Sequence, residues 1–350
     1  MLPRAIAVAA LLALGCAGAA RAEAPPGPRI AYVLATHRPI AVVIGTSDAA
    51  LGTPAIVAGG GLRARPLPAG GVAWSPDGSQ IAFDGFFAKP GIDLSHAHRR
   101  LYLVAADGSG LRPIPHTRGA FAPVFSPGGR IAFARTIRRH LPRLGPPGPS
   151  VWKGTSVWTI RPDGSSIHQL TDWRNGVTDV PSSFSADGAL LGVSHRDEIR
   201  NRDDALAIRV DGGGSRLLAK NAAWPRYSPD GGRIAYLGIE RQPGTTCCEL
   251  GDGFSVDLFV ENAEGTGRLR LTDTPAKAEQ PASWDPSGER LVFTTRESPT
   301  LTSAGLLEDA VMEINVDGSC RTKVKSETAG IFQSPAWQPG PGRELGRIAC

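Results

Sequence analysis

Trp74-Ser-Pro-Asp-Gly78, followed by Ile81-Ala-Phe83, is the stretch that decides the fold of this chain. The aromatic residue ends a strand, proline presets φ at the second turn position, and aspartate bonds neighbouring backbone amides. Glycine accepts the positive φ that closes a hairpin. The motif therefore predicts two antiparallel strands joined by a tight polar turn.

The same unit recurs along the chain, with further aromatic starts at Phe125, Phe184, Tyr227, Trp284 and, in shortened form, Trp337. The aromatic positions lie between 43 residues (Phe184 to Tyr227) and 59 residues (Phe125 to Phe184) apart. A second turn follows most copies, at Asp107-Gly108, Asp163-Gly164, Asp211-Gly212, Glu264-Gly265 and Asp317-Gly318. Two hairpins within one period of this length are typical of a propeller blade with strands A to D.

The two ends of the chain complement each other. Trp337 leaves only 13 of the 350 residues after it, too few for three more strands. Near the N-terminus, three strand-like segments lack a strand A, at Ile30–Leu34, Ile40–Ile44 and 55–67. We therefore predict an all-β, six-bladed β-propeller of four-stranded antiparallel blades, a single domain over 30–350. The C-terminal strand A joins the N-terminal strands B, C and D and covers their exposed edges.

The first residues are typical of a targeting signal. Arg4, the apolar run 5–14 and Ala20-Arg-Ala22 predict a signal peptide over 1–22, followed by a Pro-rich linker over 23–29. The mature protein is then periplasmic or extracellular. The alternative is that it is held by a lipid anchor attached to Cys16. No later apolar stretch is long enough for an integral membrane segment. The net charge of +5 includes no Lys/Arg run of the kind that binds nucleic acid.

The aromatic-Ser-Pro-Asp-Gly-x-x-Ile-Ala-Phe unit, with its Asp-Gly hairpin and the exits Leu170-Thr-Asp172 and Leu271-Thr-Asp273, resembles the propeller repeats of the TolB family. The resemblance covers about 30–350 and leaves no room for the N-terminal α/β domain of TolB. It implies that a peptide-like segment of a partner docks at the tunnel mouth. The same repeats occur in propellers attached to peptidases, so the resemblance implies function only weakly.

The candidate binding residues lie on one face. In an up-and-down blade, the B–C loops and the D–A crossings share a face, and here those B–C loops are long. We expect the crossings to contact an envelope or extracellular protein or peptide through Arg118, Asp172, Trp173, Arg174, Asp179, Asn221, Asp273, Lys277, Glu279, Gln280 and Gln333. The alternative for Asp172 and Asp273 is that they cap turns. We predict no catalytic residue, no cofactor and a monomer.

Charge on that face is predicted to be polarised. The first two B–C loops carry the basic residues Lys89, Arg99, Arg100, Arg135, Arg138, Arg139 and Arg143. The last two are acidic, with Glu240, Glu249, Asp252, Glu297, Glu308 and Asp309. Such a face can orient a partner, although solvated loop charge is the alternative interpretation.

An enzyme is the second hypothesis, a propeller lyase, lactonase or glycan-acting enzyme. No Gly-x-Ser-x-Gly motif occurs, and His96 and His98 are weak candidate metal ligands that need partners from other loops. Asp197, Glu198, Asp203 and Asp204 could hold a cation, but the interleaved Arg196, Arg200 and Arg202 favour internal ion pairs. A third hypothesis is a purely structural envelope component.

After loss of Cys16, the four remaining cysteines are Cys247, Cys248, Cys320 and Cys350. An even number suits an oxidising compartment, and their connectivity stays undetermined. Cys320 is predicted on the face opposite Cys247 and Cys248, which argues against a bond between Cys320 and either of them. The alternatives include a vicinal Cys247–Cys248 bridge and free thiols. Trp74, Trp284 and Trp337 are predicted to pack between blades.

Overall fold

The computed structural model describes residues 29–35, 40–46, 55–59, 67–87, 98–140, 151–241, 254–274, 277–297, 308–328, 331–339 and 346–350. The predicted signal peptide, Cys16, His96, Cys247 and Cys248 lie outside these ranges. All regular elements in the described ranges are β-strands. These residues contain no helix of the length and hydrophobicity needed to cross a membrane.

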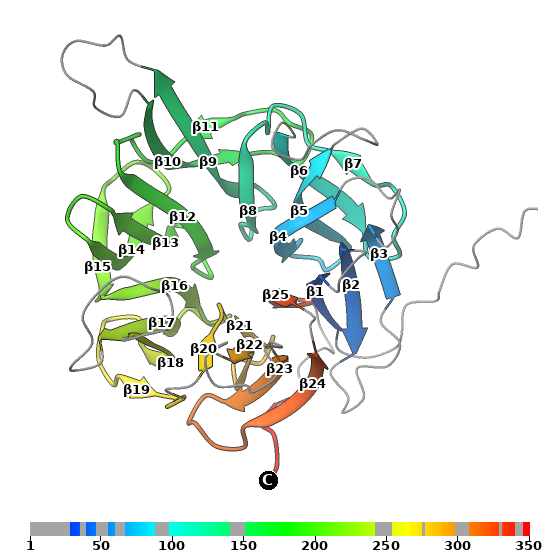
Figure 1. Cartoon of the computed structure of the whole chain (residues 1–350), viewed down its shortest axis with the longest axis vertical. Helices are drawn as coiled ribbons and strands as arrows, with labels where there is room; N and C mark the ends of the chain where they lie inside the picture. Colours follow the sequence, from blue (N-terminus) through cyan, green and yellow to red (C-terminus); the bar gives the residue numbers. More distant parts are fainter. Residues whose placement is uncertain are drawn as a thin grey trace, which may run out of the picture.

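The strands form antiparallel sheets that Figure 1 shows arranged around a common centre. One four-stranded sheet contains β4 (Leu67–Trp74), β5 (Gln80–Phe87), β6 (His98–Ala105) and β7 (Arg112–Pro113). The next strands in sequence are β8 (Ala120–Phe125), β9 (Ile131–His140), β10 (Val151–Ile160) and β11 (His168–Gln169). They are followed by β12 (Val177–Phe184), β13 (Leu190–Asp197), β14 (Arg202–Arg209) and β15 (Ser215–Lys220).

The second half of the chain repeats this order. It contains β16 (Ala222–Tyr227), β17 (Arg233–Arg241), β18 (Phe254–Asn262) and β19 (Leu269–Arg270). Then come β20 (Lys277–Glu279), β21 (Ser283–Trp284), β22 (Arg290–Glu297), β23 (Glu308–Asn315) and β24 (Thr322–Thr328). Single parallel pairs, Thr155 with Thr178 and Val256 with Ala278, link consecutive antiparallel units into larger sheets.

Strands from the two ends of the chain share a sheet. Its order is β25 (Ile331–Trp337), β1 (Arg29–Ala35), β2 (Ile40–Thr46) and β3 (Ala55–Gly59). β1 pairs antiparallel with β25, from Ile30 opposite Trp337 to Ala35 opposite Ile331. The C-terminal strand thus takes the predicted place beside the N-terminal strands, and β1 begins at Arg29, the last residue of the predicted linker.

The repeated turn is closed by its own side chains. In the first copy, the amide of Gly78 donates to the Ser75 carbonyl (2.8 Å), and the amide of Gln80 donates to Ser75 Oγ (2.9 Å). Asp77 Oδ1 accepts from the Ser79 amide (3.1 Å), and Gly78 has φ +68°. The same glycine-to-serine bond and positive φ recur at Gly129, Gly188 and Gly231. Local hydrogen bonding therefore fixes each hairpin.

The core lies between neighbouring sheets. Ile81 and Phe83 of β5 pack with Val33 of β1, whereas Ala82 packs with Phe133 of β9 on the other side. Because successive side chains of a strand point to opposite faces of its sheet, β5 packs against the neighbouring sheets on both sides. Trp74 and Trp284 are buried, and their Nε1 atoms donate to the carbonyls of Ala336 in β25 (3.0 Å) and Arg226 in β16 (2.8 Å), each in the neighbouring antiparallel unit. Their prediction as anchors is confirmed.

The strands extend further than the sequence indicates. Arg99 and Arg100 lie in β6, and Arg135, Arg138 and Arg139 lie in β9, where loops were predicted. β9 and β10 pair without interruption from Ile131 opposite Ile160 to His140 opposite Val151. These basic residues therefore stand on paired strands, and this correction matters for the site.

Candidate functional site

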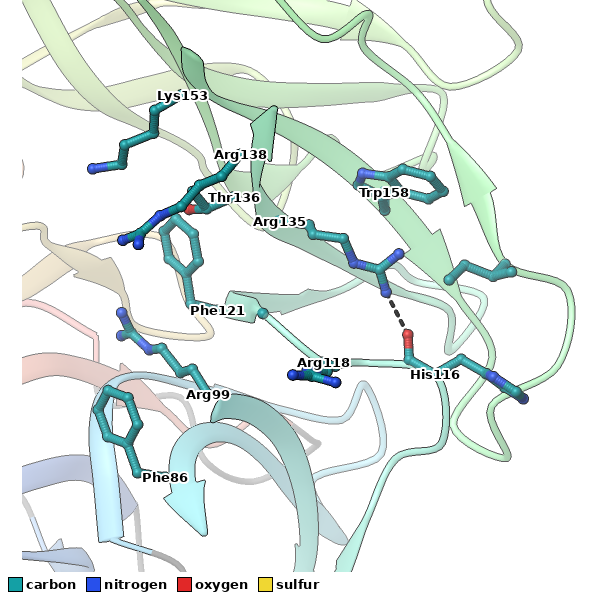
Figure 2. Close-up of a pocket in the computed structure, with 12 residues that line it drawn as sticks. Phe86, Arg99, His116, Arg118, Phe121, Arg135, Thr136, Arg138, Lys153 and Trp158 are labelled. Carbon is teal, nitrogen blue, oxygen red and sulfur yellow. Dashed lines mark hydrogen bonds between the residues drawn. The ribbon is translucent and has the colours of Figure 1, made fainter. Parts of the chain in front are cut away.

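A pocket of about 1100 Å³ opens between the β4–β7 sheet and the strands β8 to β10 (Figure 2). Its walls come from strand ends and from the connection between β7 and β8. The described lining residues are Phe86, Arg99, His116, Arg118, Gly119, Phe121, Arg135, Thr136, Arg138, Lys153, Trp158 and Ile167. Five of them are Arg or Lys, and none is Asp or Glu.

Arg99 is held in place by a buried carboxylate. Asp84 of β5 is fully buried and bonds Arg99 Nε, and its Oδ1 also accepts from the amides of Gly71 (2.9 Å) and Ala122 (3.2 Å). Ala122 has φ +50°, in the irregular stretch of β8 between Phe121 and Val124. The Arg99 guanidinium lies 4.9 Å from the Phe121 ring centre. One carboxylate thus fixes a bulge and orients a pocket cation.

Arg135 is half-buried in the wall of the pocket. Its guanidinium is 4.7 Å from the Trp158 ring centre and 5.2 Å from that of Phe133, and it donates to the His116 carbonyl (Figure 2). Its Nε is buried, with no hydrogen-bond partner among the residues the structure describes. Burial lowers the pKa of Arg135. The aromatic faces and the carbonyl keep this cation in position.

The outer part of the pocket is more exposed. Figure 2 shows Arg99 and Arg138 extending their guanidinium groups toward the same part of the pocket, and Lys153 lies on the Arg138 side. Arg138 and Lys153 are exposed, and within the described ranges neither forms an ion pair. The arrangement combines two solvated cations, two oriented cations and half-buried Phe86 and Phe121. It is suited to an anionic ligand with apolar parts.

Comparison with known proteins places this geometry in a fold. No protein-family model matches the chain, and no curated protein matches it. Solved structures do match. A putative TolB from Agrobacterium tumefaciens has a TM-score of 0.55 and 15% identity, covering 89% of this chain and 99% of that chain. The chain has a β-propeller fold similar to that of this TolB structure.

Two further solved structures match the fold of this chain. A chain of a nidogen/laminin complex has a TM-score of 0.59 and 9% identity, covering 89% of this chain and 98% of that chain. Hydrazine synthase of Kuenenia stuttgartiensis has a TM-score of 0.60 and 13% identity, covering 90% of this chain and 47% of that chain. At these identities the likeness concerns the fold, and the site has to be argued from its own residues.

The propeller brings some of the predicted site residues together. Arg118 lines the pocket, and Trp173 donates from Nε1 to the Ile137 carbonyl of β9 (3.2 Å). The crossing that contains Arg174 packs on β10, because the Gly176 amide donates to the Lys153 carbonyl (3.0 Å). Trp173 and Arg174 therefore lie beside the strand that carries Lys153, and the neighbouring Asp172 is exposed.

Other predicted residues lie elsewhere in the propeller. Asp179 of β12 is buried against His195 of β13, with 2.6 Å between Oδ1 and Nδ1. Asn221 is exposed, with φ +47°, and its carbonyl accepts from the Ile239 amide (2.7 Å). These residues support their own blades and do not line the described pocket.

A separate polar cluster contains Asp273 and Glu279. Arg270 lies 2.9 Å from Asp273 and 2.6 Å from the buried Asp257, and the buried Glu279 accepts from Thr274 Oγ1 (2.7 Å). The backbone amide of Gln280 donates to the Thr294 carbonyl (2.8 Å). Lys277 in β20 and Gln333 in β25 are placed by their backbone alone. The predicted contact set is thus spread over the pocket region, the blades that contain Asp179 and Asn221, and this cluster.

The acidic run of β13 and β14 forms ion pairs, as predicted. Arg196 pairs with Asp203, Arg200 with Asp197 (2.7 Å), and Arg202 with Asp204 (2.5 Å). Among the described residues, no group of three or more His, Cys, Asp or Glu could hold a metal ion. His98 is placed in β6 by its backbone alone.

The cysteine connectivity is resolved in part. Cys320 is bonded to Cys350, with Cα atoms 5.4 Å apart, a pairing that the sequence left undetermined. The bond joins the last residue of the chain to the turn between β23 and β24.

Sequence reasoning missed the aromatic wall of the pocket, Phe86, Phe121 and Trp158, together with His116 and Lys153. It found the cations Arg99, Arg135 and Arg138, but only as loop charge. The available signal was the strand-like alternation that continues past Phe133 to Arg135.

Proposed function

We propose that this protein is an exported, non-catalytic binding protein that holds a peptide segment of an envelope or extracellular protein. The observation that carries this proposal is the pocket between β5–β6 and β8–β10. Its volume of about 1100 Å³ lies just above the range of roughly 300–1,000 Å³ typical of small-molecule sites. Its described lining has oriented cations and aromatic rings, and neither a carboxylate nor a serine or cysteine nucleophile.

The proposal includes the architecture that presents the pocket. We propose one six-bladed domain over 30–350, closed where β25 joins β1, after a signal peptide over 1–22 and a linker over 23–29. The pairing of Ile30 with Trp337 supports closure, and the order of the antiparallel units supports the blade count. The mature protein then acts as a monomer in the periplasm or outside the cell.

Affinity capture from an envelope extract tests the binding function. Mature protein, its Arg118→Ala/Phe121→Ala variant and a Lys220→Ala control are immobilised, and retained proteins are identified by mass spectrometry. Lys220 is exposed at the end of β15 and does not line the pocket. A partner retained by wild type and control but lost by the pocket variant supports the proposal. Equal retention by all three rejects this pocket as the binding site.

A further inference from the structure

The charge of the pocket narrows the class of its ligand. The described lining contains the five cations Arg99, Arg118, Arg135, Arg138 and Lys153 and no carboxylate. Asp84 lies behind the pocket and balances Arg99 alone. Three further cations of the lining, Arg135, Arg138 and Lys153, form no ion pair with the residues that the structure describes. A ligand with several negative groups is complementary to such a surface.

The cations differ in what they can offer a ligand. Arg99 and Arg135 are fixed, the first by Asp84 and the second by the His116 carbonyl and the Trp158 ring. A fixed guanidinium can receive a carboxylate with little further loss of side-chain entropy. Arg138 and Lys153 are exposed, so they attract charge at longer range and are sensitive to salt. Arg99 and Arg135 thus orient a bound group, whereas Arg138 and Lys153, which we call the rim of the pocket, attract it from solution.

The aromatic residues favour a peptide over a carbohydrate. Sugar rings stack on open aromatic faces. Here the Arg99 guanidinium lies 4.9 Å from the Phe121 ring centre, and the Arg135 guanidinium lies 4.7 Å from the Trp158 ring centre. One face of each ring is therefore occupied by a cation. Apolar side chains that alternate with carboxylates match this pattern.

We propose that the pocket recognises an acidic peptide segment in which glutamate or aspartate residues alternate with apolar side chains. This inference rests on the proposed function and specifies its partner. Arg99 and Arg135 orient individual carboxylates, while Phe86 and Phe121 contact the apolar side chains. Arg138 and Lys153 draw the segment in.

Fluorescence anisotropy with defined probes tests the inference. The probes are a labelled octapeptide of alternating glutamate and leucine, and the same peptide with glutamine for glutamate. Wild-type protein is expected to bind the glutamate peptide more tightly, and an increase to about 0.5 M sodium chloride should weaken that binding. Arg138→Gln and Lys153→Gln should each weaken it about two- to fivefold, and the double variant about tenfold. Lys220→Gln, on an outer strand, should bind as wild type does.

The failures are distinguishable. Equal, salt-independent binding of both peptides overturns the acidic preference and leaves the peptide-binding function in place. Binding of dextran sulfate without binding of the glutamate peptide overturns it in favour of a polyanionic polysaccharide. If neither peptide binds and envelope capture retains no pocket-dependent partner, the inference and the proposed function both fail.

Discussion

Gln338 Nε2 donates a 2.6 Å hydrogen bond to the carbonyl of Gly78, a residue 260 positions earlier in the chain. The same side chain accepts from Arg29 Nε through Oε1 (2.5 Å), and its backbone amide donates to the Arg29 carbonyl (2.8 Å). Gln338 is buried. One amide side chain therefore connects the C-terminal strand, the first described strand and the repeated turn of the neighbouring blade.

Replacement of Gln338 by alanine should lower the free energy of unfolding by about 1–3 kcal/mol, because it leaves the Gly78 carbonyl and Arg29 Nε without these partners. Chemical denaturation measures the change. Gln169→Ala is the control, since the described hydrogen bond of Gln169 Nε2 runs to the carbonyl of Thr171, two residues away. A loss no larger than that of the control would argue against this connection between distant blades.

Gly154→Ala should be destabilising by about 2–3 kcal/mol. An added Cβ would collide with the Arg174 carbonyl oxygen and lie 2.8 Å from Trp173 Nε1, so the crossing behind Lys153 would have to move. Gly128→Ala is the matched control, because its nearest atom lies 4.0 Å away. Thermal unfolding and tryptophan fluorescence compare the two, and equal melting temperatures would contradict the close packing.

The repeated turns should show acid sensitivity. The Ser185 hydroxyl, and then the Ala189 amide, lower the pKa of Asp187 below its usual value near 3.8. Because the folded-state pKa is the lower one, the stabilisation is present above about pH 3.8 and is lost as pH falls through the folded-state pKa. An NMR titration of the side-chain carboxyl carbon measures the pKa directly, with Asp187→Asn to assign the signal. Ser185→Ala should raise the pKa, and an identical titration would show that the serine has no such effect.

Loss of the Cys320–Cys350 bond should lower the stability of the folded chain by up to about 3 kcal/mol, because the bond closes a loop across 30 positions. The Cys320→Ser/Cys350→Ser variant is compared with wild type by thermal unfolding without reductant. Asn315 retains its bonds to Ile348 in the variant, so the tail can stay near β23. An unchanged melting temperature would mean that these contacts hold the tail without the disulfide.

The hairpins were predictable because their chemistry is local. Ser75, Asp77 and Gly78 bond within six residues, and the pattern repeats with the same residue types. The pairing of β1 with β25 followed from counting strands, since each end lacks what the other supplies. Trp74 and Trp284 were predictable as anchors because a large aromatic residue at a fixed place in each repeat must pack against the next sheet.

The pocket was not predictable in this way. Its lining joins Arg99 and Phe121, which belong to neighbouring repeats and meet only after two sheets pack. β9 continues from Phe133 to His140, and no turn motif in the sequence marks where it ends. Its arginines were therefore assigned to a loop. The Cys320–Cys350 bond depends on the path of the chain after Trp337, which no repeat constrains.

Asp84 constrains how this surface can diverge. A mutation that alters its carboxylate would remove this partner of Arg99 and at the same time deprive the Gly71 and Ala122 amides of their acceptor. Side chains can therefore vary freely at Arg138 or Lys153, whereas a change at Arg99 must be compensated in the two adjoining strands that contain Gly71 and Ala122. Evolution of new specificity should begin at the rim and reach Asp84 last.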